Sequence, residues 1–194
     1  MFEALPLVDA TVSLDPCWLP PAQADRLFED LHSAIDWEVH RIRLFGRLVD
    51  SPRLSSWIGD SDASYVYSGV RFAPKPWPPA LARLRDQVSA AGGERFNSVL
   101  ANLYRDGRDA MGWHSDDERE LGPQPVIASL SLGAVRRFGF KHRRQPDQKL
   151  VLELGNGSLL LMSGATQCNY RHCLPRTARP VGARINLTFR RILS

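Results

Sequence analysis

Apolar side chains recur at helical spacing in two stretches of the first half of the chain. The stretch 21–36 opens on a proline, which favours the first turn of a helix, and it places Leu27 and Leu31 on one face. A second such stretch begins after Pro79 and stops at Gly92, where a pair of glycines ends it. The pattern therefore predicts two amphipathic helices before the middle of the chain.

From residue 96 onward the pattern changes to short alternating or apolar segments, which is typical of β-strands. The turn-forming sequence Gly155-Asn156-Gly157 separates two of them, and 40–72 also looks like short strands and turns. Many short strands indicate a sandwich or barrel, so we expect an α+β fold in which N-terminal helices brace a β-barrel. The predicted strands are 98–104, 126–132, 137–142, 150–154, 158–162, 170–174 and 184–190.

Composition indicates one ordinary globular domain that covers residues 1–194. The chain is 43% hydrophobic and 24% charged, with no apolar run long enough to span a membrane and no secretory signal. Its three cysteines form no CxxC pair, which favours free thiols in a reducing compartment over a disulfide framework. We therefore expect a monomer without a membrane partner, in the cytoplasm, or in the nucleus if the source is eukaryotic.

Charge adds one feature to this picture. The net charge is +4, and the stretch 134–149 holds six cations against the single acid Asp147. A phosphate-binding track and a solvated loop explain such a run equally well. The six cations are Arg136, Arg137, Lys141, Arg143, Arg144 and Lys149.

Three residues suggest a metal site. His114 and Asp116 are two positions apart, so in an extended segment their side chains leave the backbone on the same side. His172, on the predicted strand 170–174, is the candidate third ligand. Two histidines and one carboxylate leave coordination positions open, which suits a non-haem Fe(II) that activates oxygen. Alone, the His114–Asp116 pair is weak evidence, because such pairs are common in surface turns.

The last predicted strand carries a second chemical signal. Its polar and apolar side chains alternate and so point to opposite faces, which fits an edge strand with one solvent-exposed face. Two arginines with an amide on one inward face also suit a small dicarboxylate, and Asn102 and Tyr104 share a face of 98–104. Beside a metal site, this pocket points to 2-oxoglutarate as co-substrate. The polar set of the last strand is Arg184, Asn186, Thr188 and Arg190.

Several motifs together resemble the AlkB family of nucleic-acid demethylases over residues of about 43–192. They are Asn102-Leu103-Tyr104, the block Trp113-His114-Ser115-Asp116-Asp117-Glu118, the phrase Gly164-Ala165-Thr166-Gln167 before His172, and the stretch 184–190. The resemblance implies a double-stranded β-helix (jelly-roll) core over about 96–192 and a nucleotide-recognition lid over about 40–72.

The resemblance also implies roles for single residues. His114, Asp116 and His172 would be the iron ligands, with Arg184 on the distal carboxylate of 2-oxoglutarate and Arg190 nearer its metal-bound end. The full implied 2-oxoglutarate set is Asn102, Tyr104, Arg184, Asn186, Thr188 and Arg190.

Five further residues are implied to contact the damaged base. Tyr67 matches an aromatic that sandwiches the flipped base against the first iron-ligand histidine, while Tyr65 could equally be a core residue. Phe45 resembles an apolar finger that some relatives insert into a duplex, although a residue buried in a β-turn is nearly as good a reading. Asp117 and Glu118 match positions that contact the base.

The resemblance implies that the protein is an Fe(II)- and 2-oxoglutarate-dependent dioxygenase that repairs methylated DNA. RNA is a further expected partner. It would demethylate 1-methyladenine and 3-methylcytosine with O2, releasing formaldehyde, succinate and CO2. The same cofactor chemistry on RNA, protein or a small molecule, and a non-catalytic nucleic-acid-binding module, stay open. Ile58 and Leu103 depart from the family pattern. Trp113-His114-Ser115 resembles the branch that acts on single strands, whereas Phe45 resembles the duplex-acting branch, so strand preference is open.

Overall fold

A computed structural model describes residues 1–44, 47–63, 65–67 and 70–193 of this chain, with side chains described outside 42–48 and 64–72. The predicted finger residue Phe45 therefore lies outside the described residues. Tyr65 and Tyr67 lie in a described strand, but their side chains are not among those described.

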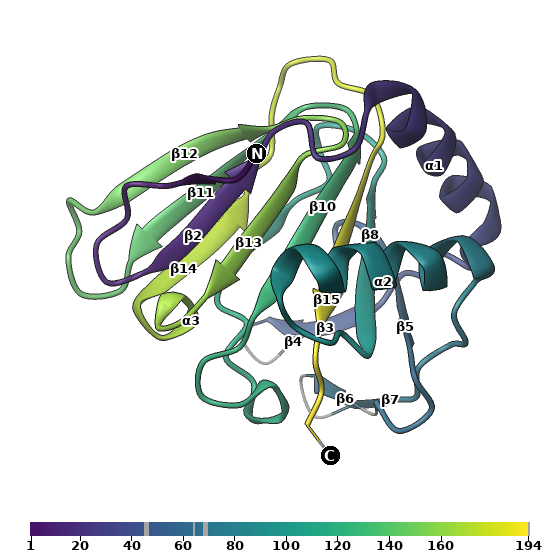
Figure 1. The fold of residues 1–194 in the computed structure, drawn as a ribbon, viewed down its shortest axis with the longest axis horizontal. Helices are drawn as coiled ribbons and strands as arrows, with labels where there is room; N and C mark the ends of the chain where they lie inside the picture. Colours follow the sequence, from purple (N-terminus) through teal and green to yellow (C-terminus); the bar gives the residue numbers. More distant parts are fainter. Residues whose placement is uncertain (45–46, 64, 68–69, 194) are drawn as a thin grey trace.

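The largest element is a seven-stranded antiparallel sheet in the order β1-β2-β13-β10-β15-β8-β5 (Figure 1). The interior strand β15 lies between β10 and β8 and is buried along its whole length, which excludes the edge-strand interpretation of 184–190. The strands of this sheet are β1 (Glu3–Ala4), β2 (Thr11–Asp15), β5 (Leu54–Gly59), β8 (Ser98–Tyr104), β10 (Ile127–Gly133), β13 (Leu159–Ser163) and β15 (Arg184–Arg190).

A four-stranded sheet in the order β12-β11-β14-β9 packs against one face of the larger sheet. An apolar layer joins the two sheets, with Ile127 and Met162 from the larger one meeting Phe138, Phe140 and Tyr170 from the smaller one. Two antiparallel sheets around one core form the predicted jelly roll. The smaller sheet consists of β9 (Met111–His114), β11 (Arg136–His142), β12 (Lys149–Leu154) and β14 (Tyr170–Leu174).

Two helices cover the other face of the seven-stranded sheet (Figure 1). Both α1 (Pro21–Ala34) and α2 (Pro79–Gly92) begin with a proline, and α2 ends at Gly93, whose φ of 65° is left-handed. They bury a stripe of apolar residues against the sheet, as the 3.6-residue period predicts. Both predicted helices are confirmed, and α1 ends two residues earlier than expected. None of the described helices is both long and apolar enough to span a bilayer.

All seven predicted strands are present, with ends that shift by one residue at most. The seven-stranded sheet also takes β1, β2 and β5 from outside 96–192, so part of the stretch 40–72 is a sheet strand. The rest of that stretch holds two short hairpins, β3 (Arg41–Leu44) with β4 (Arg47–Asp50) and β6 (Tyr65–Tyr67) with β7 (Val70–Phe72). Two short helical elements, η1 (Arg119–Leu121) and α3 (Thr166–Asn169), and turns complete the described part of the chain.

Candidate active site

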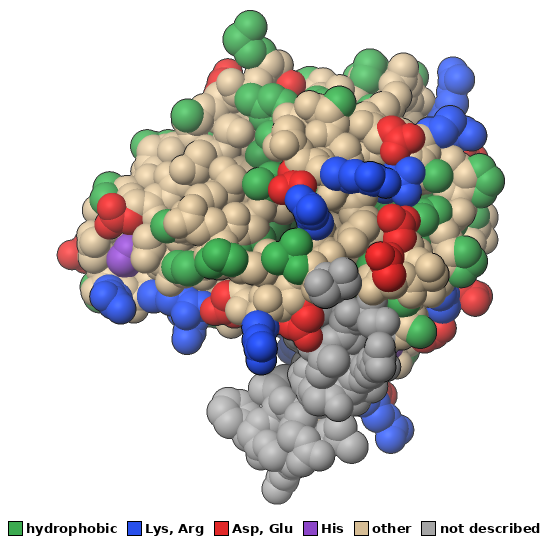
Figure 2. Space-filling model, turned by 60° about the horizontal axis from the view of Figure 1, so that its bottom comes forward, with side chains coloured by type: hydrophobic (Ala, Val, Ile, Leu, Met, Phe, Trp, Pro, Cys, Tyr) green, Lys and Arg blue, Asp and Glu red, His purple; other side chains and the backbone are tan. Residues whose placement is uncertain are grey.

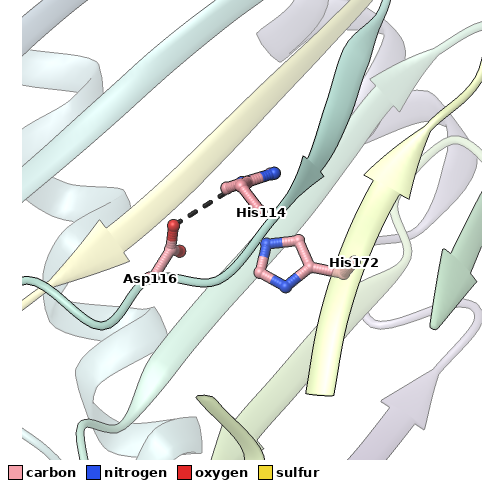
Figure 3. A group of neighbouring side chains, drawn as sticks. All are labelled: His114, Asp116 and His172. Atoms are coloured by element: carbon pink, nitrogen blue, oxygen red, sulfur yellow. Dashed lines mark ion pairs between the residues drawn. The ribbon is translucent and has the colours of Figure 1, made fainter. Parts of the chain in front are cut away.

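His114, Asp116 and His172 converge between the two sheets (Figure 3). His114 ends β9 and His172 lies directly opposite it on β14, because the two residues are paired in the antiparallel register. Asp116 follows β9 by two residues, and its Oδ1 lies 3.6 Å from Nε2 of His114. One ligand atom from each residue lies within 4.8 Å of the other two. The predicted triad is therefore brought together in space.

Neighbouring groups fix the orientation of the His114 ring and the position of the Asp116 backbone. Nδ1 of His114 lies 2.8 Å from the carbonyl oxygen of Gly112, so this nitrogen carries the proton and Nε2 is left as a metal ligand. The backbone N–H of Asp116 donates to Oε1 of Gln167 at 3.0 Å. Gln167 is buried in α3 and belongs to the phrase 164–167, which explains how that phrase serves the site.

The surrounding charges and burial set the pKa values of Asp116 and His172 in the direction that favours binding of a metal cation. Burial opposes the ionisation of Asp116, but the charges of Arg190, His172 and His114 outweigh burial and hold the pKa of the carboxyl far below its usual range. Nη2 of Arg190 lies 2.8 Å from Oδ2 of Asp116. Burial, followed by repulsion from His114, lowers the pKa of His172 to about 3. Two imidazole nitrogens with an ionised carboxylate form the donor set that fits Fe(II).

An inner cavity lies next to the triad and is lined by the polar face of β15. At its far end Arg184 is only 1% exposed, and its Nη2 donates to the hydroxyl of Ser131 at 2.9 Å. Nε and Nη1 of Arg184 have no hydrogen-bond partner, and no described carboxylate forms an ion pair with this side chain. Burial lowers its pKa to about 10, which leaves it charged at neutral pH. A buried cation with two unpaired N–H donors fits an anionic ligand such as a carboxylate.

The other predicted cavity residues lie where β15 and β8 face the same space. Asn186 donates to the hydroxyl of Ser129 at 2.8 Å, and Thr188 donates to Oδ1 of Asn186 at 3.0 Å. Oδ1 of Asn102 accepts from Nε of Arg53 at 2.7 Å. These bonds hold the polar side chains in fixed positions along one wall of the inner cavity.

Tyr104 completes the arginine end of the cavity. Two guanidinium groups lie near its ring, with the Cζ of Arg184 at 5.4 Å and that of Arg136 at 5.9 Å from the ring centre. Arg136 is buried and donates to the carbonyl oxygens of Asp106, Asp109 and Pro175. It thereby ties the loops that follow β8 and β14 to the strand β11.

An outer cavity approaches the same triad from the side of β5 and the 40–72 stretch. It shares His114, Asp116 and Arg190 with the inner cavity, so the triad lies at the junction of the two. Glu118, for which the family resemblance implies contact with the base, lines the outer cavity. The side chain of Asp117 is 48% exposed and pairs with Arg143, and it lines neither of these two cavities.

Two kinds of residue at the site were absent from the prediction. Ser129 and Ser131 lie two positions apart on the otherwise apolar strand β10, so they point to the same face, and both are buried. This alternation of serines within 127–133 is visible in the sequence. Arg53 is buried between the cavities and bonds to Ser51 and Asn102, contacts that the sequence does not reveal. The two departures from the family pattern, Ile58 and Leu103, pack in the apolar core against the helices. Neither residue lines the inner or the outer cavity.

Comparison with known proteins agrees with this geometry. Residues 11–190 match the model of the 2OG-Fe(II) oxygenase superfamily. The chain is 41% identical over 182 residues to the human "DNA oxidative demethylase ALKBH2", covering 89% of this chain and 70% of that protein. It is 36% identical over 190 residues to the human "Alpha-ketoglutarate-dependent dioxygenase alkB homolog 3", covering 93% of this chain and 66% of that protein.

A solved structure shares the fold. "The structure of OsALKBH1" superposes with a TM-score of 0.66 at 15% identity, covering 98% of this chain and 100% of that chain. The predicted fold class, the dioxygenase activity and the dependence on Fe(II), 2-oxoglutarate and O2 are confirmed. The chain belongs to the AlkB family within the 2OG-Fe(II) oxygenase superfamily.

Proposed function

We propose that this protein removes methyl groups oxidatively from 1-methyladenine and 3-methylcytosine in DNA. The observation that carries the proposal is the position of the triad, which lies where a cavity with an unpaired buried arginine meets a second cavity lined by Glu118. Two relatives with the printed name "DNA oxidative demethylase ALKBH2" and matched over most of this chain support DNA as the substrate.

His114, Asp116 and His172 would hold Fe(II), and the inner cavity would hold 2-oxoglutarate with one carboxylate against Arg184. When bound, the metal with 2-oxoglutarate and O2 supplies the oxidation of the N-methyl carbon, after which the hydroxylated methyl group leaves as formaldehyde. Nε and Nη1 of Arg184 would donate charge-assisted hydrogen bonds to that carboxylate, and Ser131 keeps the guanidinium in place.

The outer cavity would receive the damaged base. Methylation at these ring positions places a positive charge on the base, and the carboxylate of Glu118 on the cavity wall favours that charge. Arg190 keeps Asp116 in position by an ion pair, so the metal ligand does not turn toward the cationic base. Asp116 and His172 are buried between the two sheets, which limits the access of water to their side of the site.

The test is a turnover assay with purified protein. Fe(II) and 2-oxoglutarate are added without oxygen, then O2 and a single-stranded DNA oligonucleotide that carries one 1-methyladenine or one 3-methylcytosine. We expect one formaldehyde and one succinate per methyl group lost, and no formaldehyde from the unmethylated oligonucleotide. Methyl loss only from a peptide, from a small molecule or from RNA of the same sequence would contradict the proposed substrate.

A further inference from the structure

The outer face of the four-stranded sheet carries three cations in one cross-strand row. Lys141 on β11 lies directly opposite Lys149 on β12 and directly opposite Arg171 on β14. Because residues in register on neighbouring antiparallel strands point to the same face, the three side chains stand side by side. Lys149 and Arg171 are exposed and Lys141 is half-buried. We call these three residues the cation row.

Within the described part of the chain, no acidic side chain neutralises these three charges by an ion pair. No ion pair found there involves any member of the cation row. Farther along the same strands, Arg137 lies opposite Glu153, which is the ordinary pairing of opposite charges. Like charges directly opposite one another destabilise a sheet, so the cation row costs stability that an anionic partner would restore.

Trp113 supplies an exposed aromatic surface beside the cation row. Its side chain leaves β9 on the face opposite to that of His114, and the residue is 44% exposed. The indole lies against Gly139, where a Cβ atom would come within 3.1 Å of its Cη2 atom. Nζ of Lys141 lies 4.3 Å from the centre of the ring. Cations beside an exposed aromatic ring are the combination that binds single-stranded nucleic acid.

The cation row is continuous with the entrance to the site. Arg143, which follows β11, pairs with Asp117 and donates to the hydroxyl of Ser115 at 2.8 Å. Both partners flank the metal ligand Asp116. Figure 2 shows several Lys and Arg side chains, with some Asp and Glu side chains beside them, along the lower left edge of the molecule, on the side where Figure 1 places β11, β12 and β14. A nucleic-acid strand that leaves the outer cavity past Arg143 would therefore meet the cation row next.

We infer that the cation row and Trp113 bind the single-stranded DNA that flanks the base in the outer cavity. The inference rests on the proposed function and names the part of the substrate that lies outside the cavity. Adjacent strands are about 4.8 Å apart, so the row spans roughly 10 Å and reaches more than one phosphate. Lys141 exchanges the indole for a phosphate, and the freed ring face stacks on a base. The negatively charged phosphodiester backbone of the DNA removes the repulsion within the row.

The test compares two triple variants that each lose three exposed or half-buried cations. The row variant is Lys141→Gln, Lys149→Gln and Arg171→Gln; the control is Arg26→Gln, Arg83→Gln and Arg95→Gln, three exposed arginines from the helical side and the α2–β8 loop. Binding of fluorescent, unmethylated single-stranded DNA of 20 and of 5 nucleotides is measured by anisotropy between 50 and 200 mM salt.

For the 20-nucleotide DNA we expect the row variant to bind about tenfold more weakly and to lose about 2 units from the slope of log affinity against log salt. The control variant and the 5-nucleotide DNA should change less than about twofold. The row variant should unfold at the same or a higher temperature than the unmodified protein, because its repulsion is gone. Equal losses in the two triple variants, or an unchanged salt slope, would overturn the inference.

Trp113 is tested separately. Trp113→Leu should weaken binding of the 20-nucleotide DNA by about tenfold, and Trp113→Phe should restore most of it, because the phenyl ring still stacks. Equal binding by both variants, or a row-dependent preference for RNA of the same sequence, would contradict the assignment to DNA. Formaldehyde release from a methylated 5-nucleotide DNA, which is too short to reach the cation row, measures the proposed demethylase activity alone. A failure of the proposed activity is therefore distinguishable from a failure of the proposed DNA binding by the cation row.

Discussion

The strands β9 and β14 present two different chemistries on their two faces. His114 and His172 point inward, where His172 is buried and His114, partly buried, is oriented by the carbonyl oxygen of Gly112. One residue earlier on each strand, Trp113 and Arg171 point outward and are exposed. Because side chains alternate along a strand, a step of one residue separates an enclosed metal centre from an open surface.

The cations of the two regions differ in the same way. Arg184 is buried, bonded once to Ser131 and otherwise unpaired, so a ligand that reaches it gains strong and directional hydrogen bonds. The cation row is open to water, where salt screens each charge. The inner region is thus built for recognition of one small anion, and the outer face for attraction that does not depend on sequence. Substitutions in the two regions should therefore differ in their dependence on co-substrate and on salt.

The largest effect is expected from the metal centre. His172→Ala should lower formaldehyde release at least about 100-fold, because loss of even an outer partner of a metal ligand costs 10–100-fold. The loss should be the same for short and long DNA and at every salt concentration. His32→Ala, on the exposed face of α1, is the control and should retain activity. Full succinate formation by His172→Ala would show that His172 is not a ligand.

Arg184→Gln should raise the KM for 2-oxoglutarate at least about 30-fold, because a buried charge pair loses one partner. The variant without 2-oxoglutarate should be no less stable than the unmodified protein, since the removed cation has no carboxylate partner among the described residues. The unfolding temperature measured without oxygen, with and without 2-oxoglutarate, checks this prediction. A co-substrate that still stabilises the variant would place the carboxylate elsewhere.

Ser131→Ala should raise the KM for 2-oxoglutarate about fivefold, the equivalent of about 1 kcal/mol for one hydrogen bond that keeps Arg184 in place. The matched control is Ser158→Ala. Ser158 is also buried, but its hydroxyl bonds to the carbonyl oxygen of Gly155 in a turn. The control should change stability without changing the KM, and a similar KM shift in both variants would argue against the role of Ser131.

Arg143→Gln should have the smallest effect, a rise of about twofold in the KM for single-stranded DNA, because exposed ion pairs contribute little. The KM for 2-oxoglutarate should not move, and the difference should vanish at high salt. Arg191→Gln, which removes an exposed arginine paired with Glu94, is the control. A shift that persists at high salt would indicate that Arg143 acts through the position of Asp117 and the site rather than through DNA.

Periodicity predicted more of the fold than composition did. The two helices were predictable because proline and glycine mark their ends and apolar residues repeat along one face. The strands β1, β2 and β5 were harder to predict, because their pairing with distant strands, and not a local pattern, makes them part of the sheet. Likewise, burial on both faces of β15 follows from its neighbours β10 and β8.

By itself, the sequence determined the identity of the triad, the polar face of 184–190 and the family, because these rest on residue types at fixed spacing. Only the tertiary structure decided that His114 and His172 are register partners, that Arg184 has two unpaired donors, and that Arg53 bonds to Asn102. It also decided that Lys141, Lys149 and Arg171 form one row, although a basic run was visible. The physical reason is that spacing along a strand sets only the face of each side chain, whereas pairing between distant strands sets which side chains meet.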